Sequence, residues 1–71
     1  MNDLNSKVSR IVGKYINTSK VSQEALSKKI GVSQSSLSRS LAGKKLWLVR
    51  DLEALAAIGV DFGHLFDNEE V

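Results

Sequence analysis

The chain has 71 residues without cysteine or proline, and its 42% apolar content is that of an ordinary globular domain. A single domain of this size buries about 60% of its unfolded surface, so it folds with little margin. The absence of cysteine excludes disulfides and zinc-finger modules. The N-terminus has no signal-peptide pattern, and the longest apolar run, residues 54–58, is far shorter than the roughly 20 residues of a membrane span. We therefore expect a soluble cytoplasmic protein.

Charge is divided unevenly along the chain. Residues 1–50 hold all ten Lys and Arg against two acids, a net charge of +8, whereas residues 51–71 hold six acids and no base, a net charge of −6. The first part is suited to face a polyanion, of which nucleic acid is the first candidate and an anionic membrane surface the second. We expect one domain over residues 1–66 and an acidic, flexible tail over 67–71.

Apolar spacing predicts the first helix over about 3–17, with one hydrophobic stripe. Two shorter helices follow, and each has a serine N-cap: Ser22 for a helix that runs to about Ile30, and Ser33 for one that runs to about Ala42. A glycine with a left-handed backbone, Gly31, is expected to end the first of the two.

A fourth helix is predicted over about 48–58, with Leu48, Leu52, Leu55 and Ile58 on one side. Residues 61–66 are expected to form one last short turn. No alternating strand pattern occurs, so the predicted fold class is all-α, a compact bundle of four to five helices.

The short link Gly31-Val32-Ser33 has the length of the turn in a helix-turn-helix, in which two helices cross steeply. Ser27 is small where the two helix backbones must approach, and Leu37 faces inward. The opposite face of the third helix then carries Ser35, Ser38 and Arg39, with Gln34 in its exposed first turn. These polar side chains, with no acid among them, suit base edges and phosphates, and a Gln can bond bidentately to adenine.

The segment 23–44 resembles the helix-turn-helix of the phage repressor and Cro family of xenobiotic-response-element type. The resemblance rests on Gln23, Ser27, Gly31 and Leu37, at the family's spacing, and on the pair Gln34-Ser35. It covers essentially the whole chain, because residues 52–60 are similar to the family's fourth helix. It implies a lambda-repressor-like fold, although Leu46-Trp47-Leu48 is more apolar than the loop often found there.

The resemblance also implies site residues. By this resemblance, the residues that would contact bases are Gln34, Ser35, Ser38 and Arg39. Gln23 would bond a phosphate and brace Gln34, while Lys44 and Lys45 would hold the DNA backbone. Further phosphate candidates are Ser33, at a helix N-terminus that can hold an anion, and Lys28, for which a solvated face is the alternative.

Three aromatic or aliphatic residues near the C-terminus leave two interpretations open. Phe62, Leu65 and Phe66 form either a dimer seam or the closure of the core. For Trp47 we expect a partly buried core position, with a subunit contact as the alternative.

The predicted function is a sequence-specific, double-stranded DNA-binding transcription repressor, a phage immunity or Cro-like regulator in a bacterial or phage-infected cell, which can act as a homodimer. The alternatives are a helix-turn-helix antitoxin and a protein-interaction module such as an anti-repressor. We expect no enzyme activity, cofactor or small-molecule ligand, because the chain has no complete nucleophile elbow and no glycine-rich phosphate loop. It also has no metal-ligand cluster, and we expect no membrane partner.

Overall fold

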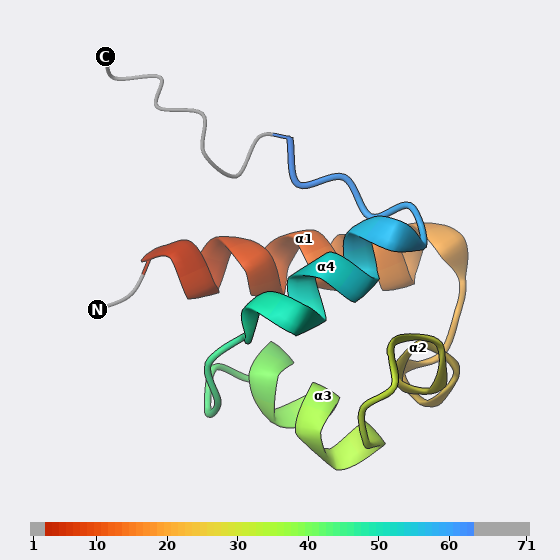
Figure 1. The fold of residues 1–71 in the computed structure, drawn as a ribbon, viewed down its shortest axis with the longest axis horizontal. Coiled ribbons are helices and arrows are strands. Elements are labelled where there is room, and N and C mark those ends of the chain that lie inside the picture. The colour runs from red at the N-terminus through yellow and green to blue at the C-terminus, as the bar shows by residue number, and fades with distance from the viewer. Residues whose placement is uncertain (1–2, 64–71) are drawn as a thin grey trace.

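The computed structural model describes residues 3–63, and within that range the chain forms four helices and no strand. The all-α prediction is therefore confirmed at the level of four packed helices. In Figure 1 α1 runs along the molecule, α4 crosses in front of it, and α2 and α3 lie together on one side. The helices are α1 (Asp3–Ser19), α2 (Gln23–Ile30), α3 (Gln34–Leu41) and α4 (Val49–Ala57).

The two predicted serine caps are present. Ser22 and Ser33 both have extended backbone, and the side-chain oxygen of each accepts a backbone N–H three residues on, from Ala25 and Ser36, at 3.0 Å. Each bond satisfies one of the N–H groups that a helix start leaves without a partner. The beginnings of α2 and α3 are thus determined by local sequence.

The ends of α1 and α2 use the same left-handed backbone with different residues. Gly31 has φ +78° and ends α2 as predicted, with the N–H of Val32 donating to the carbonyl of Ser27 at 3.0 Å. Lys20 does the same for α1 with φ +60°, a conformation that is costly for a residue with a side chain. Helix α1 therefore continues two residues beyond the predicted 17.

The start of α4 differs from the prediction. Leu48 is not on the buried side of the helix; it is the residue before the first turn, and 42% of it is exposed. Its N–H donates to the carboxylate of Asp51 at 3.1 Å, so the acid three residues on stabilises the helix start. Leu55 is buried and Leu52 half-buried, as expected for the inner face.

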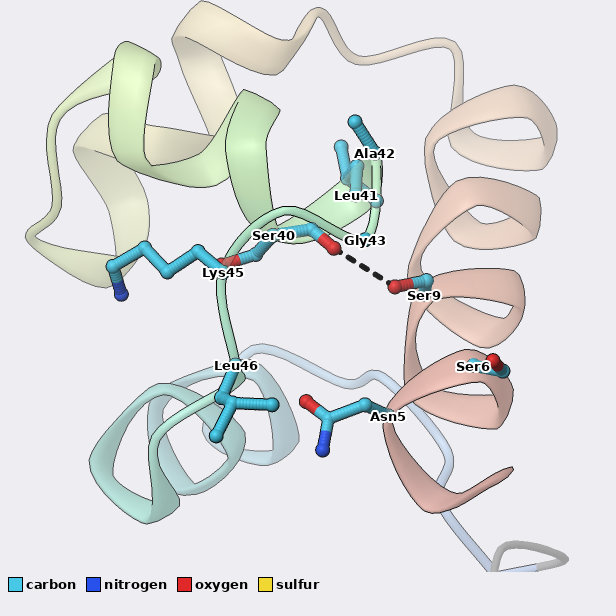
Figure 2. A pocket seen from close by; sticks show the side chains of 9 residues that line it. All are labelled: Asn5, Ser6, Ser9, Ser40, Leu41, Ala42, Gly43, Lys45 and Leu46. Carbon is cyan, nitrogen blue, oxygen red and sulfur yellow. Dashed lines mark hydrogen bonds between the residues drawn. The ribbon is translucent and has the colours of Figure 1, made fainter. Parts of the chain in front are cut away.

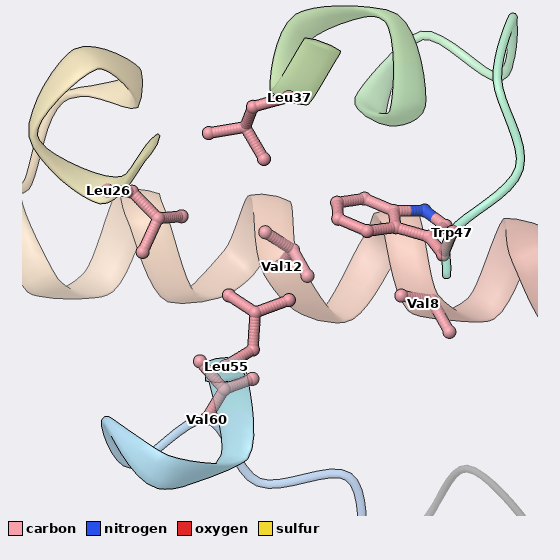
Figure 3. Close-up of a cluster of buried hydrophobic side chains, with 7 residues drawn as sticks. All are labelled: Val8, Val12, Leu26, Leu37, Trp47, Leu55 and Val60. Carbon is pink, nitrogen blue, oxygen red and sulfur yellow. The ribbon is translucent and has the colours of Figure 1, made fainter. Parts of the chain in front are cut away.

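The core lies between the four helices (Figure 3). Side chains from every helix enter it, together with one residue from the loop before α4 and one after α4, and Trp47 is buried as expected. Such burial contributes about 25 cal/mol for each Å² of apolar surface removed from water. The buried apolar residues are Val8, Val12, Leu26, Leu37, Trp47, Leu55 and Val60.

Some predictions fall at or beyond the end of the described range. The sequence predicts a final short turn over 61–66, of which the structure describes residues 61–63, and these contain no helix. Leu65, Phe66, the domain end at 66 and the acidic tail over 67–71 lie outside the described residues. None of the helices that the structure describes is long and apolar enough to cross a membrane.

Candidate nucleic-acid interface

The inner face of α3 holds the helix against the rest of the domain. Leu37 and Ser40 are both buried there. Ser27 on α2 is buried as well, and its hydroxyl donates to the carbonyl of Glu24 at 2.7 Å, so this small residue leaves no polar group without a partner. In Figure 1 α2 is seen nearly end-on while α3 lies across the view, and hence the two axes cross steeply.

The outer face of α3 carries the four predicted base-contacting residues. Gln34, Ser35, Ser38 and Arg39 are all exposed, and no hydrogen bond or ion pair with another described residue occupies their side chains. One amide, two hydroxyl groups and one guanidinium can therefore bond an external partner without first breaking a bond within the protein. Within residues 34–41 there is no acid that would repel a polyanion.

The two predicted contacts at helix starts differ in exposure. Ser33 is exposed, and because its oxygen accepts the N–H of Ser36, its own hydroxyl hydrogen remains able to donate. Gln23 is half-buried at the first position of α2, and no hydrogen bond joins it to Gln34 in this structure. The bracing role of Gln23 thus stays a prediction.

A hydrogen bond to the last turn of α3 holds the backbone of the segment that carries Lys44 and Lys45. Gly43, at φ +82°, ends the helix, and the N–H of Lys44 donates to the carbonyl of Arg39 at 2.9 Å. Lys44 is exposed and Lys45 half-buried, three and four positions beyond Leu41, the last residue of α3. Lys28 is exposed but lies 3.7 Å from the carboxylate of Glu24, which offsets part of its charge.

A hydrogen-bond network that the sequence did not indicate fixes the far end of α3. The hydroxyl of Ser9 on α1 donates to the carbonyl of Ser40 at 2.9 Å (Figure 2) and accepts the indole N–H of Trp47, also at 2.9 Å. The backbone N–H of Trp47 donates to the side-chain oxygen of Asn5 at 2.7 Å. Three segments, α1, the end of α3 and the loop before α4, are thereby tied together. The spacing of Ser40, three residues after Leu37, is the one signal that could have placed it inward.

Asn5, Ser9 and Ser40 are among the residues that line a shallow pocket of about 360 Å³ between α1 and the loop after α3 (Figure 2). Of its polar side chains, Asn5 and Ser9 take part in the hydrogen-bond network described above. No group of three or more His, Cys, Asp or Glu that could hold a metal ion occurs among the described residues.

Of the three residues predicted either to form a dimer seam or to close the core, the structure describes only Phe62. It is half-buried and packs against the core cluster, which favours core closure for this residue. The seam formed with Leu65 and Phe66 stays a prediction.

Comparison of the chain with known protein families, with curated proteins and with solved structures finds no match. What indicates a function is therefore the chemistry of the α2–α3 surface.

Proposed function

We propose that this chain is a sequence-specific, double-stranded DNA-binding protein of transcription-repressor type, in which α2 and α3 form a helix-turn-helix and α3 enters the major groove. The observation that carries the proposal is the outer face of α3. It presents Gln34, Ser35, Ser38 and Arg39 without internal partners on a helix that is anchored along its other side. The major groove admits one α-helix, and its base edges offer the donors and acceptors that such side chains bond.

Backbone contacts are supported by the charge distribution and by the helix starts. All ten basic residues lie in the first 50 residues, and Lys44 and Lys45 lie in the loop after α3. The N-termini of α2 and α3 add N–H groups and a partial positive charge, both suited to a phosphate. Phosphate contacts of this kind determine position and affinity, whereas base contacts determine sequence preference.

Repression follows from occupancy. A domain seated in the groove of an operator excludes RNA polymerase from the same stretch of DNA, and this requires no catalytic group. Arg39 is suited to bond guanine bidentately and Gln34 to bond adenine, so the preferred site should contain both bases on the groove face that α3 covers.

The test is a selection of bound sequences from a random DNA pool at two salt concentrations. We expect an enriched motif that survives the higher salt, because base contacts are less sensitive to counterions than phosphate contacts. Binding without a motif, lost at the higher salt, would reduce the interface to a basic surface. Absence of binding at both concentrations would refute the proposal.

A protein-interaction module is the second candidate. The observation that favours it is the exposure of Leu46 and Val49, large apolar side chains that gain stability from being covered. This function predicts no affinity for DNA even at low salt, so the same selection distinguishes the two.

A further inference from the structure

The segment between α3 and the first turn of α4 exposes an uncommon amount of apolar surface. Leu46 is 62% exposed, Leu48 42% and Val49 70%, and among the other large hydrophobic residues of the described chain only Leu4 is exposed to a similar extent. Trp47, in the middle of the segment, is held inward by its bonds to Ser9 and Asn5. Because the backbone of Trp47 is fixed in this way, its neighbours cannot turn inward together with it.

The outer face of α4 continues this apolar surface. Besides Val49, the small residues Ala56 and Ala57 are exposed on the helix. Two charged side chains, Arg50 and Glu53, share that face, and neither has an ion pair among the described residues, although they are three positions apart. The α4 face, defined here as residues 46, 48–50, 53, 56 and 57, thus combines apolar groups with one cation and one anion that form no ion pair with a described residue.

We infer that the α4 face is the contact between two copies of this chain. In a twofold interface the same patch meets itself, so a residue that contacts a second residue is contacted by that residue of the other copy in return. Two antiparallel α4 helices would place Arg50 of each copy beside Glu53 of the other and form two ion pairs. Alanines at the same face allow the helices to approach closely. A partner of uniform charge would satisfy only one of the two side chains, whereas a second copy satisfies both.

The size of the face sets the strength of the dimer. A stable interface of standard size buries about 800 Å² on each partner, roughly a sixth of the 4959 Å² surface of this chain. The three exposed aliphatic side chains alone do not supply that area, so the whole outer face of α4 has to take part. We expect a dimer that dissociates on dilution. The inference does not depend on DNA binding, since it concerns the protein alone.

The experiment is sedimentation equilibrium of the full chain without DNA, from about 1 µM to about 1 mM, a range that brackets weak association. Arg50→Glu makes both charged positions of a protomer acidic, and Glu53→Arg makes both basic. Each single variant should therefore raise the dimer dissociation constant about tenfold or more, because like charges face one another twice in each dimer. An equimolar mixture of the two single variants should recover the association as a heterodimer, and the double variant should recover it as a homodimer.

The matched control is Lys29→Glu, an exposed charge reversal on α2 that lies outside the α4 face and should leave the dissociation constant unchanged. Circular dichroism of each variant checks that the helices are retained. Three results would overturn the inference. These are a chain that remains monomeric throughout the range, a dimer that both single variants leave intact, and single variants whose mixture stays monomeric. DNA selection on the same variants reports separately on the proposed function.

Discussion

At the residue scale, the side chains that matter most are those with unoccupied hydrogen-bonding groups and those whose groups are fully used. Gln34 belongs to the first kind: it is exposed and its amide has no partner among the described residues. Ser9 belongs to the second kind, because its single hydroxyl serves both Trp47 and Ser40. Substitution of Gln34 should affect DNA binding alone, and substitution of Ser9 should affect the stability of the fold.

Gln34→Ala should weaken binding to the selected DNA site by about 1–3 kcal/mol and relax the base preference at one position, because one bidentate contact is lost. Titration of the selected site and of single-base variants measures both effects. Asn17→Ala removes an exposed amide from a different helix, α1, and serves as the control. Unchanged specific binding by Gln34→Ala would show that α3 is not placed in the groove as proposed.

Ser9→Ala should lower the free energy of unfolding by about 1–3 kcal/mol, since the indole N–H of Trp47 loses its partner and the carbonyl of Ser40 keeps only its backbone partner, the N–H of Gly43. Ser6→Ala, an exposed serine on the same helix, should change stability by less than about 0.5 kcal/mol. Urea denaturation of the two variants gives the comparison. Equal stabilities would mean that the network contributes nothing.

At the scale of elements, the helix boundaries show what local sequence determines. Ser22, Ser33 and Gly31 act within three to five residues of their own position, and all three were predicted from sequence. Lys20 ends α1 with a left-handed backbone that its residue type does not indicate, so the end of that helix was placed too early. Leu48 was assigned to the buried side of α4 from its spacing, but the Asp51 carboxylate makes it the residue before the helix.

Two glycines of the chain should respond oppositely to substitution by alanine. Gly31→Ala should destabilise the fold by about 1 kcal/mol, because an L residue is strained at φ +78°. Gly13→Ala should stabilise it by about 0.5–1 kcal/mol, because Gly13 lies inside α1 and an added Cβ would meet nothing within 4 Å apart from its chain neighbours and the adjacent helix backbone. Thermal unfolding measures both changes, and effects of the same sign would contradict the assignment of the turn.

At the scale of the whole molecule, the four-helix arrangement follows largely from apolar spacing and caps, whereas the contacts that join distant segments do not. Asn5 and Trp47 are 42 positions apart, and Ser9 and Ser40 are 31 positions apart. Nothing in the local pattern around any of them indicates the partner, since the pairing exists only once α1 lies against α3. The outer face of α3 could be predicted from helical periodicity alone, while its anchoring at the C-terminal end could not.

Because all the basic side chains lie in the first 50 residues, a test has to separate the lysines that contact DNA phosphates from those that only add positive charge. Lys44→Ala should weaken binding to all DNA sequences alike and reduce the salt dependence by about one counterion, because one phosphate contact is removed. Lys14→Ala, an exposed lysine on α1, should leave that slope unchanged. Binding isotherms at several salt concentrations give both slopes. If the salt dependence of binding is the same for the two variants, Lys44 makes no phosphate contact of its own and only adds to the overall positive charge of the protein.

Trp47 is the single tryptophan of the chain, it is 9% exposed, and its indole N–H donates to Ser9. Its fluorescence emission therefore comes from one position, at the junction of α1, the end of α3 and the segment that leads into α4. A change in emission on adding DNA would report movement at this junction, because the indole itself lies away from the outer face of α3. The intrinsic fluorescence of Trp47 therefore reports on how these three segments pack together, and no added label is needed.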